Sequence, residues 1–151
     1  MKKKTKINNV LLLIVTFCFN AILSQDNPVS WAIVSNDSML IYNAQIGKDW
    51  HLYAAYMPNP NDGPLPTLFE YTPSKNYLLN DSTIQENPIT HFDDDFGVEV
   101  SYYEDNALFK QKIKITTENR FLINGKISYM CCNDVTCIPL EKKFEIIINP
   151  D

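Results

Sequence analysis

The stretch Ala107–Ile115, ALFKQKIKI, alternates from Phe109 onwards between mostly apolar residues and lysines. A period of two is typical of an antiparallel strand that has one face on a core and the other in water. Lysines on the wet face also deter pairing at an open sheet edge. The residues assigned to the dry face are Phe109, Gln111, Ile113 and Ile115, and those on the wet face are Lys110, Lys112 and Lys114. This stretch therefore predicts a sheet.

Short apolar runs of the same kind recur along the chain between turn signals, and no long run has a helical period. The segments predicted to be strands are 29–34, 39–46, 50–56, 67–71, 98–103, 107–115, 120–132 and 141–148. The passage 58–66 is rich in proline, which lacks the N–H that a central strand needs. Residues 73–90 are polar and irregular. About eight strands without a repeat predict an all-β, immunoglobulin-like β-sandwich, with a closed barrel as the alternative.

Composition limits the function further. The chain has 151 residues, of which 45% are hydrophobic, and a formal charge of −5. That length favours one domain, and the apolar fraction predicts a packed core. The negative charge argues against a nucleic acid partner, because phosphate binding needs a basic face.

The first 24 residues have the layout of a secretory signal peptide, with a lysine-rich start, an apolar run Val10–Phe19 and a small residue at Ser24. Cleavage there would leave a mature domain 25–151 in the periplasm. The leader takes four lysines with it, so 13 − 4 = 9 basic residues face 18 acidic ones, a formal charge of −9. No later segment is apolar enough to span a membrane. A lipid anchor at Cys18 is the less favoured reading, because bulky Phe17 precedes it.

The segment Tyr129–Pro139, YMCCNDVTCIP, carries the chemical signal. It joins two predicted strands, so Cys132 and Cys137 would face each other across a short hairpin, within reach of a disulfide. Cys131 would point to the opposite face. The pair is compatible with a structural staple, with thiol–disulfide exchange or, less readily, with a metal site. Its C-x4-C spacing differs from the usual zinc spacing, and His51 and His91 are interpreted as packing or turn residues.

The segment Gly125–Pro139 resembles the redox loop of the N-terminal periplasmic domain of the thiol:disulfide interchange protein DsbD. Further stretches agree in order, so that the resemblance covers nearly the whole mature chain. They are VSW at 29–31, WHLY at 50–53, GPLP at 63–66 and FDDDFGVEV at 92–100.

The resemblance implies an immunoglobulin-like domain whose cysteine pair relays reducing equivalents without a cofactor, and it associates the chain with cytochrome c biogenesis. The implied donor is a membrane-embedded thiol reductant, and the implied acceptors are periplasmic thioredoxin-like proteins. The family's redox pair corresponds to Cys132 and Cys137. Its protective cap loop corresponds to Asp93–Gly97, with Asp94, Asp95, Phe96 and Gly97 as its site residues and Phe96 as the lid.

Two features depart from the family pattern. Full-length members continue into a membrane domain and a thioredoxin-like domain, whereas this sequence ends at Asp151, so a separate donor is expected. Cys131 stands unexpectedly beside the pair. Phe96 has a second interpretation as an ordinary core residue, although the three carboxylates before it favour a surface loop. The alternative function is a non-catalytic immunoglobulin-like binding module with a structural disulfide.

Overall fold

The computed structural model describes residues 27–36 and 38–150, and these residues contain ten strands. The predicted leader and Cys18 lie outside these residues. None of the described residues forms a helix that is long and apolar enough to cross a membrane. In chain order the strands are β1 (Val29–Asn36), β2 (Met39–Ile46), β3 (His51–Tyr53), β4 (Leu68–Tyr71), β5 (Tyr77–Gln85), β6 (Ile89–Asp93), β7 (Val98–Tyr103), β8 (Asn106–Ile115), β9 (Phe121–Cys132) and β10 (Cys137–Ile148).

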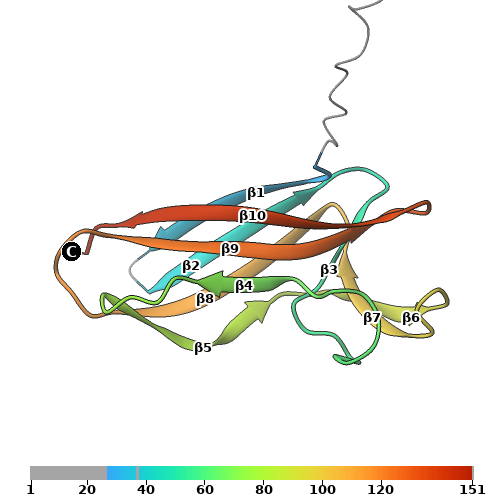
Figure 1. Ribbon diagram of the computed structural model, residues 1–151, viewed down its shortest axis with the longest axis horizontal. Helices are drawn as coiled ribbons and strands as arrows, with labels where there is room; N and C mark the ends of the chain where they lie inside the picture. Colours follow the sequence, from blue (N-terminus) through green and yellow to red (C-terminus); the bar gives the residue numbers. More distant parts are fainter. Residues whose placement is uncertain (1–26, 37, 151) are drawn as a thin grey trace, which may run out of the picture.

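The strands are arranged in two antiparallel sheets that pack face to face (Figure 1). One sheet has the order β1-β2-β8-β5, and the other has the order β10-β9-β3-β7-β6. Strand β4 pairs with β9 beside β3, so these two short strands share one edge of β9. The all-β, immunoglobulin-like sandwich predicted from the sequence is confirmed.

The alternation in β8 has the predicted effect on burial. Phe109 and Ile113 are buried between the sheets, whereas Lys112 and Lys114 are exposed. The Phe109 ring contacts the rings of Trp31, Phe69 and Tyr103 at centroid separations of 5.2–6.1 Å. Because Phe109 contacts three other aromatic rings, this part of β8 lies at the centre of the core. Aromatic side chains bury large apolar areas, so the cluster contributes strongly to stability.

Strand β5 lies inside 73–90, which the sequence predicts to be irregular, and β6 begins there and ends at Asp93. Strand β5 buries only Tyr77, and it pairs with β8 through a bulge between Asn80 and Ile84. Strand β6 pairs with β7 at the edge of the other sheet and has no buried side chain. Edge strands of this kind are held by backbone hydrogen bonds, so they leave no apolar period in the sequence. Strand β3 is also shorter than the predicted 50–56.

A second, smaller core cluster lies on the outer face of the β10-β9-β3-β7-β6 sheet. Successive side chains of a strand point to opposite faces. Cys131 therefore belongs to the main core, whereas Cys132 joins Tyr53 and Val100 in the second cluster. The proline-rich loop 58–66 lies against this cluster. Gly63 in that loop adopts φ +103°, and a Cβ there would come within 3.2 Å of Val98, so glycine suits both the backbone and the close packing.

Candidate functional site

Cys132 ends β9 and Cys137 begins β10, and the sheet register pairs the two residues directly. They form a disulfide with their Cα atoms 4.0 Å apart. The intervening turn is organised by Asn133, whose Oδ1 accepts hydrogen bonds from the amides of Val135 and Thr136, both at 2.9 Å. The Asn133 amide in turn donates to the Thr136 carbonyl at 3.0 Å. Asparagine is favoured in such turns because its side chain can bond the backbone two residues on.

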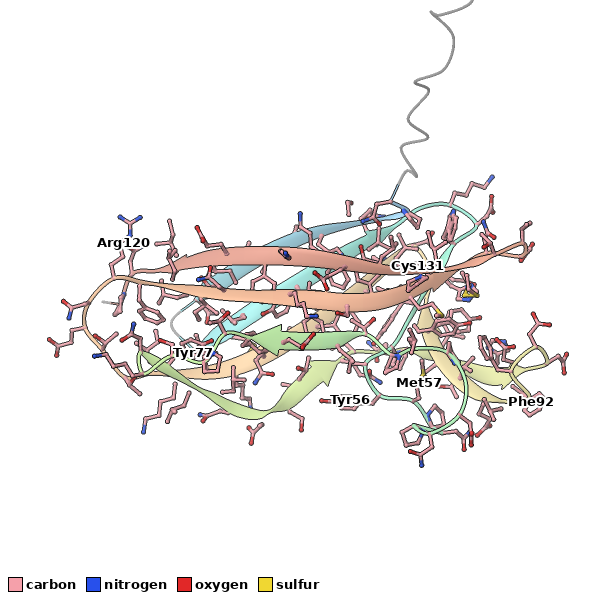
Figure 2. The ribbon with its side chains drawn as sticks, in the orientation of Figure 1. Tyr56, Met57, Tyr77, Phe92, Arg120 and Cys131 are labelled. Atoms are coloured by element: carbon pink, nitrogen blue, oxygen red, sulfur yellow. A yellow bond between two sulfur atoms is a disulfide. The ribbon has the colours of Figure 1, made fainter. Side chains whose placement is uncertain are left out.

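The two bonded cysteines differ sharply in accessibility. Cys132 is 2% exposed and packs in the second cluster with Tyr53 and Val100, with Met57, Val98, Tyr102 and Met130 around them. Cys137 is an exposed residue at the rim of the hairpin. In Figure 2 the neighbouring Cys131 lies at the same end of the sandwich as Met57 and Phe92, whereas Tyr77 and Arg120 lie at the other end. An incoming thiolate can therefore approach the bond from the Cys137 side.

The predicted cap loop is a tight turn between β6 and β7. The Asp93 carboxylate accepts hydrogen bonds from the amides of Asp95 at 3.0 Å and Phe96 at 3.1 Å, and the Gly97 amide donates to the Asp93 carbonyl at 2.7 Å. Gly97 adopts φ +70°, which glycine tolerates without strain. Asp94 and Asp95 are exposed at the surface.

The turn directs the Phe96 ring towards the cluster that buries Cys132. This ring and that of Tyr53 form a T-shaped pair with a centroid distance of 6.2 Å and an interplanar angle of 90°. Tyr53 is itself packed with Cys132. Phe96 remains 38% exposed, so it lies over the second cluster as a surface residue and is absent from the main core.

Sequence reasoning missed the role of His51 in this arrangement. His51 is the direct partner of Cys132 in the β3–β9 register. Its Nε2 lies 3.2 Å from the Tyr53 hydroxyl, and its ring packs 5.1 Å from that of Tyr102. The His91 ring also packs against that of Tyr102, with a centroid distance of 5.1 Å. The HLY sequence places His51 and Tyr53 on one strand face, but their position beside Cys132 depends on long-range pairing.

The electrostatics around His51 act in opposite directions. Burial lowers the pKa of the imidazole below its usual value, and this is the largest effect. The carboxylates of Asp93, Glu104 and Asp134 act to raise the pKa. Burial also raises the pKa of the Tyr53 and Tyr102 phenols, so both hydroxyls are protonated at neutral pH.

Cys131 is a free, fully buried thiol on the opposite face of β9. It lies between Leu52 of β3 and Ile138 of β10 in the sheet register. Burial raises the pKa of this thiol to about 12. Since the thiolate is the reactive form, burial and the raised pKa both disfavour reaction of Cys131 in the folded protein.

Two surface hollows bear on where a ligand or partner binds. The larger, about 740 Å³, lies over β4, β9 and β10 around Gly125 and Phe144. Gly125 is seven residues from Cys132, roughly 23 Å along the strand, so this hollow is remote from the disulfide. The smaller, about 320 Å³, is polar and includes His51, Glu104 and Asp134 beside the disulfide hairpin. Within the described residues, no group of three or more histidine, cysteine or carboxylate side chains is arranged to hold a metal ion.

Comparison with known proteins identifies the architecture. Residues 20–148 match the family model described as thiol:disulfide interchange protein DsbD, N-terminal. The reduced DsbD N-terminal domain of Neisseria meningitidis superimposes with a TM-score of 0.63 at 17% identity, covering 86% of this chain and 93% of that one. A structure of the complex between the DsbD N-terminal and PilB N-terminal domains of the same species matches with a TM-score of 0.58 at 14% identity, covering 87% and 94%. No curated protein matches the chain.

Proposed function

The chain belongs to the family of DsbD N-terminal domains, and from this premise we propose that it relays reducing equivalents through the Cys132–Cys137 disulfide. The proposed donor is a separate membrane-embedded thiol reductant. The proposed acceptors are periplasmic thioredoxin-like proteins and oxidised exported proteins, including those of cytochrome c biogenesis. Thiol–disulfide exchange needs no cofactor, because the two cysteines carry both electrons. Membership of a family of periplasmic domains supports this location for the mature domain 25–151, with 1–24 as the proposed leader.

The observation that carries the proposal is the position of the disulfide at the end of an already paired hairpin. Strands β9 and β10 are in continuous register over twelve residue pairs, from Cys132–Cys137 to Phe121–Ile148. The disulfide closes a loop of about six residues, which the chain-entropy model values at about 2 kcal/mol, against about 4.7 kcal/mol for a loop of 100 residues. A purely structural disulfide at this position would add little stability beyond that of the paired strands β9 and β10. An exposed sulfur at a hairpin tip is instead well placed for exchange.

The complex of a similar domain supports the choice of a protein partner. The DsbD N-terminal domain of Neisseria meningitidis forms a solved complex with the PilB N-terminal domain. The similar fold of the present chain supports a folded protein as its partner, and we propose that this partner docks at the disulfide end. We propose a thioredoxin-like partner whose reactive cysteine meets Cys137.

The reaction itself provides the test of the proposed function. The reduced protein is mixed with an oxidised thioredoxin-like protein, quenched with acid, and both chains are analysed by mass after thiol tagging. We expect the partner to gain two thiols while Cys132 and Cys137 lose two and form their disulfide. The variant with both cysteines changed to Ser should leave the partner oxidised. Equal reduction of the partner by that double variant would contradict the proposal.

We further propose that the turn Asp93–Gly97 caps the reduced pair. Carboxylates close to a thiol disfavour its thiolate, and desolvation beneath Phe96 acts in the same direction, so both raise the thiol pKa. The reduced protein then reacts slowly with small disulfides until a docking partner displaces the turn. Such protection would limit wasteful exchange in an oxidising compartment.

Replacing Phe96 with Ala is expected to speed alkylation of the reduced protein by iodoacetamide about 5- to 10-fold, because it removes the apolar cover near the thiols. The matched control is Phe92→Ala on the same turn-forming hairpin. Phe92 is more exposed, at 57%, and it lies on the face of β6 opposite to the face that carries His91 and Asp93. Equal rates in the parent protein, Phe96→Ala and Phe92→Ala would contradict the cap.

Changing Asp94 and Asp95 to Asn should lower the apparent pKa of alkylation of the reduced protein by iodoacetamide, because it removes carboxylates that disfavour the thiolate.

A further inference from the structure

The thiol of Cys132, the buried cysteine of the pair, must lose its proton before it can react. Cys132 must become a thiolate to attack a mixed disulfide at Cys137, since the protonated thiol does not react. Cys132 is 2% exposed and packed among Tyr53 and Val100, and burial without a positive partner disfavours the thiolate. Exchange therefore needs a base within reach of a sulfur that bulk water does not reach freely.

His51 occupies the position such a base requires. It is the cross-strand partner of Cys132, and directly opposed side chains in an antiparallel pair have Cβ atoms about 4.5–5.5 Å apart on the same face. Its ring is held by the Tyr53 hydroxyl at Nε2, 3.2 Å away, and by the Tyr102 ring. The same His51 side chain lines the polar hollow of about 320 Å³ that opens to solvent. His51 is thus both the register neighbour of the buried cysteine and a lining residue of a surface hollow.

We propose that His51 is the proton acceptor and donor for Cys132 during exchange, an inference that rests on the proposed redox function. When the reduced pair passes electrons on, the Cys137 thiolate attacks the acceptor disulfide, and the acceptor's first sulfur leaves as a thiolate. Neutral His51 takes the proton from Cys132. The Cys132 thiolate then attacks Cys137, which forms the internal disulfide and releases the acceptor's second sulfur as a thiolate. The acceptor has gained two electrons and the pair has lost two.

Reduction of the pair runs through the same groups in reverse. A donor thiolate attacks Cys137, the Cys132–Cys137 bond breaks, and its electron pair goes to the Cys132 sulfur. Protonated His51 returns a proton to that thiolate. The donor's second thiolate then attacks the mixed disulfide and frees Cys137, leaving the donor oxidised.

The charges that face His51 suit both protonation states. Burial favours the neutral ring, as does nearby His91 of β6. Three carboxylates favour the charged ring, from Asp93 of β6, from Glu104 after β7 and from Asp134 in the cysteine hairpin. Lys48, Asp49 and Asp105 also line the hollow. Since burial outweighs the carboxylates, the ring is mainly neutral at pH 7 and ready to accept a proton.

The test separates the two chemical steps with 5,5′-dithiobis(2-nitrobenzoate), a small aromatic disulfide that releases a coloured thiolate. The reagent is used in large excess, so that the first attack, which the proposed cap slows, is still faster than the intramolecular second step. Attack by Cys137 on the reagent releases the first coloured thiolate, and attack by Cys132 on the mixed disulfide releases the second. We expect His51→Gln to slow the second release about 100-fold at pH 6–7, the lower end of general base catalysis. The first release should change less than about twofold. The difference should shrink as pH rises, because the thiolate then forms without help.

Two further variants exclude a purely structural effect. His51→Phe keeps a ring against Tyr53 and Tyr102 but has no base, so it should slow the second release as His51→Gln does. His91→Gln removes the other histidine that packs on Tyr102. The register partner of His91 is Val100 and not a cysteine, so this variant should behave as the parent protein. An unchanged second release in both His51 variants overturns the inference while leaving the exchange function intact. A parent protein that never shows the second release overturns the exchange function and the inference together.

Discussion

Replacing Cys132 with Ser is expected to trap the protein in a covalent complex with its partner through Cys137. The exposed Cys137 can still attack a partner disulfide, but the chain then has no second thiol in reach to resolve the bond. Cys131 does not substitute, because it is buried on the opposite face of β9 with its pKa raised to about 12. Non-reducing electrophoresis and mass analysis should show the complex, which a reductant should release.

The converse variant is the control for the roles of the two sulfurs. Cys137→Ser keeps the buried Cys132, which a folded partner cannot approach directly, so no complex should form. Complexes with Cys137→Ser and none with Cys132→Ser would reverse the assignment. Complexes with both variants would show that the difference in burial does not select the reacting sulfur.

Truncating Phe109 to Ala is expected to lower the free energy of unfolding by about 3–5 kcal/mol, the range for deletion of a buried aromatic ring. Phe109 has no exposed surface and contacts three other aromatic rings of the core. Urea unfolding of the oxidised protein measures the change through a shifted midpoint at constant slope.

Lys112→Ala on the same strand provides the reference for this measurement. Lys112 is exposed, and its ion pair with Asp81 spans 3.4 Å at the surface, where such pairs contribute little. We expect a change within about 0.5 kcal/mol. Similar losses for Phe109→Ala and Lys112→Ala would mean that β8 does not lie at the centre of the core.

The extent to which the sequence predicts the fold follows from which strands bury a face. Strand β8 bears a clear period of two because one face packs on the core, and that period alone indicates a sheet. Strands β5 and β6 are edge strands with mostly exposed side chains, held by pairing with β8 and β7. The residues of a polar segment such as 73–90 do not indicate which strand its backbone will pair with.

The site divides in the same way. The hairpin that opposes Cys132 and Cys137 is local, so a separation of 5 in sequence is enough to predict it. The Asp93–Gly97 turn is also local, since its hydrogen bonds join residues at most four apart. The meeting of His51 with Cys132 joins β3 to β9 across 132 − 51 = 81 positions. That contact is fixed only by sheet order, which the residues around His51 do not specify.

The reduction potential of the Cys132–Cys137 pair distinguishes a relay from a structural disulfide. The oxidised protein is equilibrated in dithiothreitol buffers of graded potential, quenched with acid and scored for free thiols by mass tagging. Cys131→Ala serves as a second sample, because a buried thiol whose reaction is disfavoured should not affect the result. A relay requires one two-electron transition above about −300 mV, unchanged in Cys131→Ala, and this is the expected result. A transition below about −300 mV in both proteins would mark the disulfide as a structural bond and contradict the proposed relay.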